Sequence, residues 1–407
     1  MSDNGRSPWY SRPGSWFWFV VLLGAALRLY LVLWTYGTQD VTIWERHARD
    51  VREHGLIGYY HADPSGNHPP FISEVESWLL AASDATGVPF RIFLRAPFAL
   101  LDAATAFLLF SLLGACQWRF LAAAAYWLNP LSIIFSAYHG NTDSAVAFFL
   151  VLCVWLLSKD GLLAAAIALG ISLWIKLPTV LAIPALLFFI PNWRKRFQFL
   201  LIAGVVALAT YVPALFQDLP IVWKNVFGYR AQILNTTAGV PAWGPRILLF
   251  SVIAAPQNWP TRLHAPIVLF LGNSWLIALA LALMVTWLRR FKRSVPELCA
   301  TIAGIYIIVL AFSDGFSFQY LAWSLPFWFF FPRWFFIPAI VLVSGYIYAL
   351  YAYLCGNPWL LGIWDFDGHP YWPSLIIALR NAAYLLFCAG AVWFLISTTA
   401  QAFRVRR

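Results

Sequence analysis

Charged residues of this 407-residue chain concentrate directly after its first apolar stretch. Asp40 comes first, where that stretch ends, and residues 45–54 add arginines, histidines and further acids. Charged residues make up only 11% of the chain, so this concentration stands out. A positioned carboxylate can act as a general base and take a proton from a hydroxyl group. Asp40 is therefore the candidate catalytic residue, whereas most of the later charges are expected to solvate an exposed helix face.

Polar residues also interrupt later apolar stretches. His68 opens the sequence HPPF, which predicts a rigid turn that breaks a helix. His139, Asn141 and Asp143 lie in the sequence YHGNTDS, between two stretches without charge. Asp143 could equally cap the helix that begins near it. His139 has no such local role, although a lone histidine is more often structural. We group these four residues as candidate substrate-binding residues.

Basic side chains supply the complementary charge. Arg95 and Asp102 lie two turns apart on one helix face, and Arg28 in the first apolar stretch is the expected ion-pair partner of Asp102. Arg95 then remains for a phosphate group. Lys176, in the sequence WIKLP, either extends its ammonium group to lipid headgroups or holds a lipid phosphate.

Later loops contribute the remaining candidates. Arg230 and Arg246 lie in a loop at 217–264, and the sequence SDGFSFQYLAW carries Gln319 and Tyr320. Guanidinium groups bind phosphate well because they donate paired hydrogen bonds. Acids, histidines and bases thus recur at the ends of apolar stretches over most of the chain. A transporter usually keeps such groups near the middle of the membrane, between repeats, and no internal repeat is visible here.

The elements that must position these residues are membrane helices. The chain is 61% hydrophobic with a mean hydropathy of +0.71. Repeated apolar stretches of about 20 residues match the thickness of a bilayer core. The net charge of +10 falls mainly in short loops, which indicates membrane topology and not nucleic-acid binding. The sequence therefore predicts an all-α polytopic membrane protein that forms a single domain over 1–407.

The apolar stretches predict about twelve transmembrane helices. They lie at about 16–36, 92–113, 119–138, 142–158, 161–175, 177–190, 197–216, 265–288, 297–312, 317–331, 334–354 and 374–397. Lysines and arginines then fall in alternate loops, which places both termini in the cytoplasm and the acid-rich loops outside. The first stretch is expected to be a retained signal anchor.

The first extracytoplasmic loop, 37–91, is predicted to hold two interfacial helices. Val41, Trp44, Ala48 and Val51 recur at helical spacing with charges between them. The stretch at 71–83 carries Glu74 and Glu76, and charge is costly inside a bilayer. We therefore expect this second segment to lie at the membrane surface.

This order of parts resembles the GT-C superfamily of membrane glycosyltransferases. The sequences LNPLSIIFSAYHGNTDSAVAFFLVL, WIKLPTVLAIPAL and FQYLAWSLPF are most similar to the catalytic subunit of GPI mannosyltransferase I and its bacterial relatives. The order also resembles the dolichol-pathway glucosyltransferases, and the resemblance covers roughly residues 15–330. It implies a GT-C fold, a sugar donor carried on polyprenyl phosphate, an extracytoplasmic active site and inversion at the anomeric carbon.

The resemblance also implies roles for the candidate residues. Asp40 stands where the family has its catalytic acid, but the mannosyltransferase has Asp-x-Asp where this chain has Asp40-Val41-Thr42. No metal ligands are assigned, no cofactor is required, and a divalent ion is left open. The other candidates would contact the sugar or neutralise the phosphate. These are His68, Arg95, His139, Asn141, Asp143, Lys176, Arg230, Arg246, Gln319 and Tyr320.

The sequence thus favours a hexosyltransferase, with mannose as the first candidate sugar, in a bacterial cytoplasmic membrane. Its partners would be a polyprenyl-phosphate sugar and a lipid-linked or envelope glycan acceptor, with no nucleic acid. A lipid or sugar transporter, or flippase, is the main alternative and would depend on charges at mid-membrane, such as Arg28 and Asp102. A non-catalytic scaffold subunit of a cell-envelope machine is the third, and it would tolerate loss of Asp40.

Overall fold

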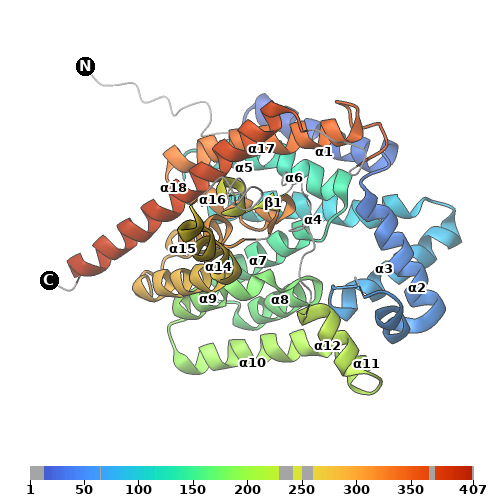
Figure 1. The fold of residues 1–407 in the computed structure, drawn as a ribbon, viewed down its shortest axis with the longest axis horizontal. Coiled ribbons are helices and arrows are strands. Elements are labelled where there is room, and N and C mark those ends of the chain that lie inside the picture. Colours follow the sequence, from blue (N-terminus) through green and yellow to red (C-terminus); the bar gives the residue numbers. More distant parts are fainter. Residues whose placement is uncertain are drawn as a thin grey trace.

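The computed structural model describes residues 13–405 except 65, 115, 229–241, 250–259, 315 and 366–371. The described chain is mostly helical, as the apolar periodicity predicted (Figure 1). In the first half the elements are α1 (Ser15–Trp34), α2 (Gln39–Ala62), α3 (Pro70–Thr86), α4 (Phe90–Leu112), α5 (Arg119–Trp127), α6 (Pro130–Ile133), the π-helix η2 (Ile134–His139), α7 (Asp143–Ser158), α8 (Leu162–Ile175), the 3-10 helix η3 (Leu177–Ala182), α9 (Ile183–Phe189) and α10 (Trp193–Ala209).

The second half continues with shorter and longer helices and two short strands. They are α11 (Val212–Leu215), α12 (Leu219–Phe227), β1 (Ala242–Trp243), α14 (Thr261–Leu288), α15 (Val295–Phe312), β2 (Phe316–Ser317), the 3-10 helix η6 (Phe318–Trp323), α16 (Leu325–Trp328), α17 (Arg333–Cys355) and α18 (Ser374–Val405). The strands β1 and β2 pair antiparallel. In Figure 1, α2 and α3 form one side of the molecule, whereas α18 runs toward the opposite side.

Six helices in the described part of the chain are long and apolar enough to cross a membrane: α1, α4, α14, α15, α17 and α18. The bent pair formed by α5 with α6 and η2 makes a seventh if it is one span. The chain is therefore a multi-pass membrane protein. The twelve predicted spans are not established by these helices, since several of the predicted stretches are divided into shorter pieces.

Prolines explain much of this division. Pro130 opens α6 directly after the end of α5, and the two segments meet at an angle of 45°. Pro178 lies in the 3-10 helix η3, and Pro184 lies in the first turn of α9, which follows immediately. Proline fixes its backbone and lacks an N–H group, so it favours helix starts and interrupts longer helices. The hydropathy of the sequence alone does not reveal these interruptions of the helices.

The helix predicted after the first apolar stretch is present as α2, and its apolar side is buried. Val41, Trp44, Ala48 and Val51 are each at most 5% exposed. The helix is kinked at Gly55, whose φ of +74° is a conformation that other residues rarely adopt. Pro69 caps the next helix, so the predicted proline turn separates α2 from α3. This helical pair packs closely and carries Asp40 on its first turn.

A buried ion pair joins the helices beside this unit. The Arg28 Nε atom of α1 lies 3.0 Å from Asp102 Oδ2 of α4, which confirms the predicted pair. Arg28 also donates to the carbonyl oxygens of Gly24 and Trp127, and its guanidinium lies 3.6 Å from the centre of the Trp127 ring. The pair thereby ties α1, α4 and α5 together in the interior.

Candidate functional site

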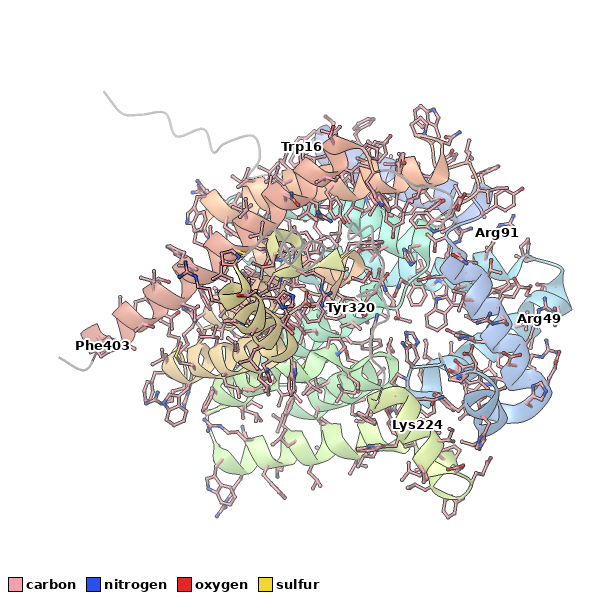
Figure 2. The ribbon with its side chains drawn as sticks, viewed as in Figure 1. Trp16, Arg49, Arg91, Lys224, Tyr320 and Phe403 are labelled. Atoms are coloured by element: carbon pink, nitrogen blue, oxygen red, sulfur yellow. The ribbon has the colours of Figure 1, made fainter. Side chains whose placement is uncertain are left out.

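A cavity of about 610 Å³ opens between the α2–α3 pair and the rest of the protein. Its polar lining comes from segments far apart in the sequence. These are the first turn of α2, the turn before α3, the end of η2, the end of α8 and the β2–η6 segment. Tyr320 of η6 lies near the middle of the view, whereas Arg49 and Lys224 lie toward the periphery (Figure 2).

Asp40 reaches this cavity because the chain turns sharply after α1. Gly37 has a φ of +85°, and a Cβ atom there would lie 2.8 Å from Val41 and 2.9 Å from the Tyr138 carbonyl oxygen. Only glycine fits such a position without displacement. The turn brings Asp40 Oδ2 to 2.7 Å from His139 Nε2. Among the described residues, Asp40 Oδ1 has no hydrogen-bond partner, and 38% of the side chain remains exposed.

The environment of Asp40 favours its ionised form. Burial raises the pKa of the carboxyl group, but the electrostatic interaction and the hydrogen bond with His139 oppose this, and the positive charge of Lys176 adds to the lowering. The net result is a pKa below the usual value of the group. A hydrogen-bonded carboxylate with one unoccupied oxygen can accept a proton from a ligand hydroxyl in the cavity.

His139 is held at the end of the π-helix η2. It is 3% exposed, and Gly140 after it has a φ of +69° that ends the helix. The ring contacts Asp40 through Nε2, whereas Nδ1 forms a hydrogen bond with the hydroxyl of Tyr351 on α17. Asn141 Nδ2 lies 3.5 Å from His139 Nε2, at the edge of hydrogen-bond distance. The carboxylate is therefore positioned by a histidine that is itself fixed from behind.

A second charged pair forms another part of the site. Lys176 Nζ lies 2.8 Å from Asp143 Oδ1, and the Asp143 side chain is fully buried. Trp323 Nε1 also donates to Asp143 Oδ1. Asp143 begins α7 without capping it, and Asn141 instead accepts from the Asp143 N–H group. Both contacts of the carboxylate are made by Oδ1, whereas Oδ2 has no hydrogen-bond partner among the described residues. Lys176 thus enters the cavity on an anchored side chain.

Aromatic rings surround the polar groups. Tyr320 and Trp323 stack with centroids 4.3 Å apart, and the ammonium group of Lys176 lies 4.8 Å from the Tyr320 ring centre. Trp44 packs against His68 at 4.4 Å, and Trp364 also lines the cavity. Rings of this kind provide flat apolar surfaces with polar edges for a ligand.

His68 is uncharged in this environment at neutral pH. Burial is the main cause that lowers its pKa well below the usual value, and the charges of Lys176 and His47 act in the same direction, against Asp40. Its backbone carbonyl accepts a hydrogen bond of 2.6 Å from Tyr60, and Asn225 of α12 donates to the Tyr60 carbonyl at 2.9 Å. The turn that holds His68 is therefore tied to two helices.

Seven of the candidates chosen from the sequence meet around this cavity. Asp40, His68, His139, Asn141, Lys176, Gln319 and Tyr320 line it. Asp143 lies behind it and contacts Lys176. The structure thus brings together residues from five distant segments. The spacing of these residues along the chain does not reveal that they meet in space.

Arg95 is placed differently from the phosphate-binding role expected for it. It is fully buried and does not line the cavity. Its nitrogen atoms donate to the carbonyl oxygens of Val32 and Thr35 at the end of α1, and to the Thr35 hydroxyl. A cation is favoured at a helix C-terminus, where carbonyl groups lack partners. Arg95 therefore fixes the end of α1 just before the turn that carries Asp40.

Arg246 does not line the cavity either. Arg246 forms an ion pair with Asp314 at 2.9 Å beside the β1–β2 strands. Arg230 lies outside the described residues. Four residues of the site, by contrast, were not selected from the sequence: Trp44, Tyr351 and Trp364, together with Trp323. Aromatic residues are so frequent in this chain that their type alone gave no signal.

Metal ligands are not assembled in the described part of the chain. No group of three or more histidine, cysteine, aspartate or glutamate side chains is arranged there to hold an ion. The fold and the site define a class of protein: a multi-pass helical membrane protein with an open cavity that is lined by a carboxylate–histidine pair and an anchored lysine. No protein-family model matches the chain, and no curated protein matches it significantly.

Proposed function

We propose that this protein is an inverting glycosyltransferase of the GT-C type, using a polyprenyl-phosphate sugar as donor. A hexose, with mannose first, would be transferred to a lipid-linked or envelope glycan on the extracytoplasmic side. The observation that carries the proposal is the unoccupied carboxylate oxygen of Asp40, in a cavity that also receives the ammonium group of Lys176. In such a reaction the carboxylate would accept the proton of the acceptor hydroxyl, and the ammonium group would neutralise the leaving phosphate.

The proposed reaction uses Asp40 as the base and Lys176 as the cation that binds the phosphate. Asp40 accepts the proton of the acceptor hydroxyl while that oxygen attacks the anomeric carbon of the donor. The bond between the anomeric carbon and the phosphate oxygen breaks, and the polyprenyl phosphate leaves with the bonding electrons. Lys176 neutralises the negative charge that develops on the leaving phosphate. Attack opposite the leaving group inverts the anomeric configuration.

The volume and the lining of the cavity are suited to a sugar. Its volume of about 610 Å³ falls within the range of about 300–1,000 Å³ found for small-ligand sites. The rings of Trp44, Tyr320 and Trp364 present flat surfaces on which a pyranose can stack. Gln319 and Asn141 add amide groups that can bind sugar hydroxyls.

The number of membrane passes and the side on which the cavity lies are part of the same proposal. About twelve passes, both termini in the cytoplasm and an extracytoplasmic cavity agree with the distribution of basic residues. Exposed apolar side chains on α10 support passes beyond the six long helices. Trp193, Phe197, Leu201 and Val205 recur there every four residues and are each more than half exposed. A cytoplasmic membrane of a bacterium is the proposed location.

A transfer assay tests the proposal. Wild type, Asp40→Asn and Asp84→Asn are purified in detergent and supplied with short-chain polyprenyl-phosphate mannose, glucose or arabinose and a membrane lipid extract. Each reaction is run with and without EDTA, and donor loss is followed by mass spectrometry. Asp84 is the matched control, because it is an exposed acid on α3 that pairs with Arg52.

We expect Asp40→Asn to slow donor consumption by about 10² to 10⁴-fold, the usual contribution of a general base. Asp84→Asn should match the wild type. Equal consumption by wild type and Asp40→Asn would remove Asp40 from the mechanism. A folded wild type that consumes no donor would favour a transporter or a scaffold, and the EDTA arm decides whether a divalent ion takes part.

A further inference from the structure

The hydrogen bond between Tyr351 and His139 has no role in the mechanism described so far. Tyr351 lies on α17, far along the chain from Asp40, and its side chain is fully buried. Its hydroxyl contacts His139 Nδ1, while the opposite ring nitrogen faces Asp40. Tyr351, His139 and Asp40 therefore form one chain of hydrogen bonds that ends in the cavity.

The direction of this chain follows from the number of donors and acceptors. A phenol group carries one proton that it can donate. Among the described residues, the Tyr351 hydroxyl has no hydrogen-bond partner other than His139. If His139 donated from Nδ1, the phenol proton would be left buried without an acceptor, which costs free energy. The arrangement that satisfies Tyr351, His139 and Asp40 has Tyr351 donating to Nδ1, and only the long 3.5 Å contact from Asn141 Nδ2 to His139 Nε2 is not a hydrogen bond in it.

The proton of a neutral His139 must then lie on Nε2. A neutral imidazole has one donor and one acceptor nitrogen, so an acceptor Nδ1 requires a protonated Nε2. That N–H group points at Asp40 Oδ2 over 2.7 Å. Rings of Phe135, Tyr351 and Trp364 pack around the imidazole and hold its plane.

We propose that Tyr351 is a positioning residue that fixes the Nε2–H tautomer of His139, and that Asp40 alone therefore takes the acceptor proton. This inference rests on the proposed transferase function. His139 has no vacant lone pair in this state, since one nitrogen is protonated and the other is occupied by Tyr351. The Nε2–H group stabilises the carboxylate form of Asp40 and leaves Oδ1 for the acceptor hydroxyl.

Loss of the Tyr351 hydroxyl should change the acid–base properties of the site. In Tyr351→Phe, Nδ1 loses its donor, and His139 can adopt the other tautomer or a second proton. The first outcome removes the hydrogen bond that favours ionised Asp40, so the pKa that governs activity at low pH rises. The other groups that act on Asp40, Lys176 and His68, stay in place.

Two measurements test this inference, and they are independent of each other. The first is the nitrogen NMR spectrum of the detergent-solubilised wild type with labelled histidine, in which His139→Gln identifies the His139 signals. We expect a protonated Nε2 and an unprotonated Nδ1 at neutral pH. An imidazolium ion or an Nδ1–H tautomer would overturn the inference. This result does not depend on whether any donor is consumed, so it is separable from failure of the transferase proposal.

The second measurement is the pH profile of kcat for Tyr351→Phe. We expect a fall of roughly three- to tenfold at neutral pH, the size of one lost hydrogen bond. The acid limb should shift upward by roughly half a pH unit or more. Tyr346→Phe is the matched control, because Tyr346 is also fully buried on α17 and its hydroxyl has no partner among the described residues.

An unchanged acid limb in Tyr351→Phe, together with an unchanged His139 tautomer, would overturn the positioning role. An equal loss of activity in Tyr346→Phe without any pH shift would also contradict it, because that pattern would indicate a packing effect of α17. If Tyr351→Phe does not fold, the wild-type NMR spectrum still decides the tautomer.

Discussion

The carboxylates of Asp102 and Asp40 both face a basic side chain, but their surroundings differ. Asp102 is 2% exposed, and both of its oxygen atoms are occupied. Oδ2 binds Arg28 and lies 3.4 Å from Ser136, while Oδ1 accepts from Tyr126 at 2.5 Å. Asp40 uses one oxygen for His139 and keeps the other in contact with the cavity.

This difference separates a structural ion pair from the carboxylate that is proposed to react. A buried charge is tolerated when it is paired and hydrogen-bonded, and the Asp102 network meets that condition because both carboxylate oxygens have partners. Such a network has no capacity left for a ligand, so it stabilises packing between α1, α4 and α5. A carboxylate with a vacant oxygen beside a cavity can bind and accept a proton. The contrast therefore favours an active site at Asp40 over a transport path through Arg28 and Asp102.

The largest effect should follow from breaking the structural pair. Asp102→Ala leaves the charge of Arg28 buried without its partner, and such changes typically cost about 3–5 kcal/mol of stability. We expect a strongly lowered melting temperature in detergent. The double variant Arg28→Met, Asp102→Leu should recover much of the loss, since it removes both charges. Asp40→Ala should melt close to the wild type, and a strong loss of stability there would contradict the comparison.

Lys176→Met should have the next largest effect, on donor use. The change removes the cation proposed to neutralise the leaving phosphate, so we expect kcat/KM for the lipid-phosphate donor to fall by roughly 10- to 100-fold. Lys176→Arg should retain part of the activity because the charge is kept. Lys224→Met on the exposed side of α12 is the control. Equal activity of Lys176→Met and wild type would remove Lys176 from the phosphate site.

A change at His139 tests the acid–base part of the comparison. The pKa of Asp40 lies below its usual value in the folded protein, so its ionised form persists at neutral pH and is lost only as the pH falls through that lowered pKa. His139→Gln removes the main opposing effect and leaves the raising effect of burial. The acid limb of kcat should therefore move to higher pH by roughly one unit. A profile identical to that of the wild type would show that His139 does not act on Asp40.

Glu76 adds a third case to the comparison, with the smallest expected effect, because its carboxyl group has no hydrogen-bond partner in the described part of the chain. It is 1% exposed, and neither oxygen has a hydrogen bond among the described residues. Burial raises the pKa of Glu76 well above its usual value, so the folded protein keeps a proton that the unfolded chain releases above the usual pKa of 4.5. This linkage lowers stability as the pH rises from that value toward the raised pKa.

Glu76→Met should therefore stabilise the protein by about 1 kcal/mol at pH 8 and have little effect near pH 4. Thermal unfolding at both pH values measures the difference. Glu53→Met on the exposed side of α2 is the control and should show no such pH dependence. A stabilisation that is equal at both pH values would indicate better packing and not loss of a proton linkage.

The sequence predicted the chemistry of the site better than its geometry. Asp40, His139 and Lys176 stand out because charged residues are rare in this chain, and the structure places them around one cavity. Arg95 is also a charged residue, but its guanidinium donates hydrogen bonds to carbonyl oxygens at the end of α1 and does not reach the cavity. Residue type does not reveal which carbonyl groups lie within reach of a guanidinium.

The fold, too, was predictable only in part from the sequence. The amphipathic pattern correctly indicated α2, because the buried positions follow the helical period directly. The number of membrane passes stays a prediction, since apolar stretches such as 177–190 and 317–331 are made of short helical pieces. Tyr351 could not be recognised, because the role inferred for it comes from one hydroxyl that meets His139 across the fold.

The π-helix η2 makes the alignment of the site sensitive to the number of residues in this segment. It carries Ser136 toward Asp102 and His139 toward Asp40, so the structural and reactive networks meet on one short segment. A wide turn of this type holds one more residue than the regular helix it replaces. Deletion of one codon between Ser136 and His139 would change the angle between these two side chains around the helix axis by about 100°. A gene altered in this way would still encode Asp40, His139 and Tyr351, but the protein would no longer align them.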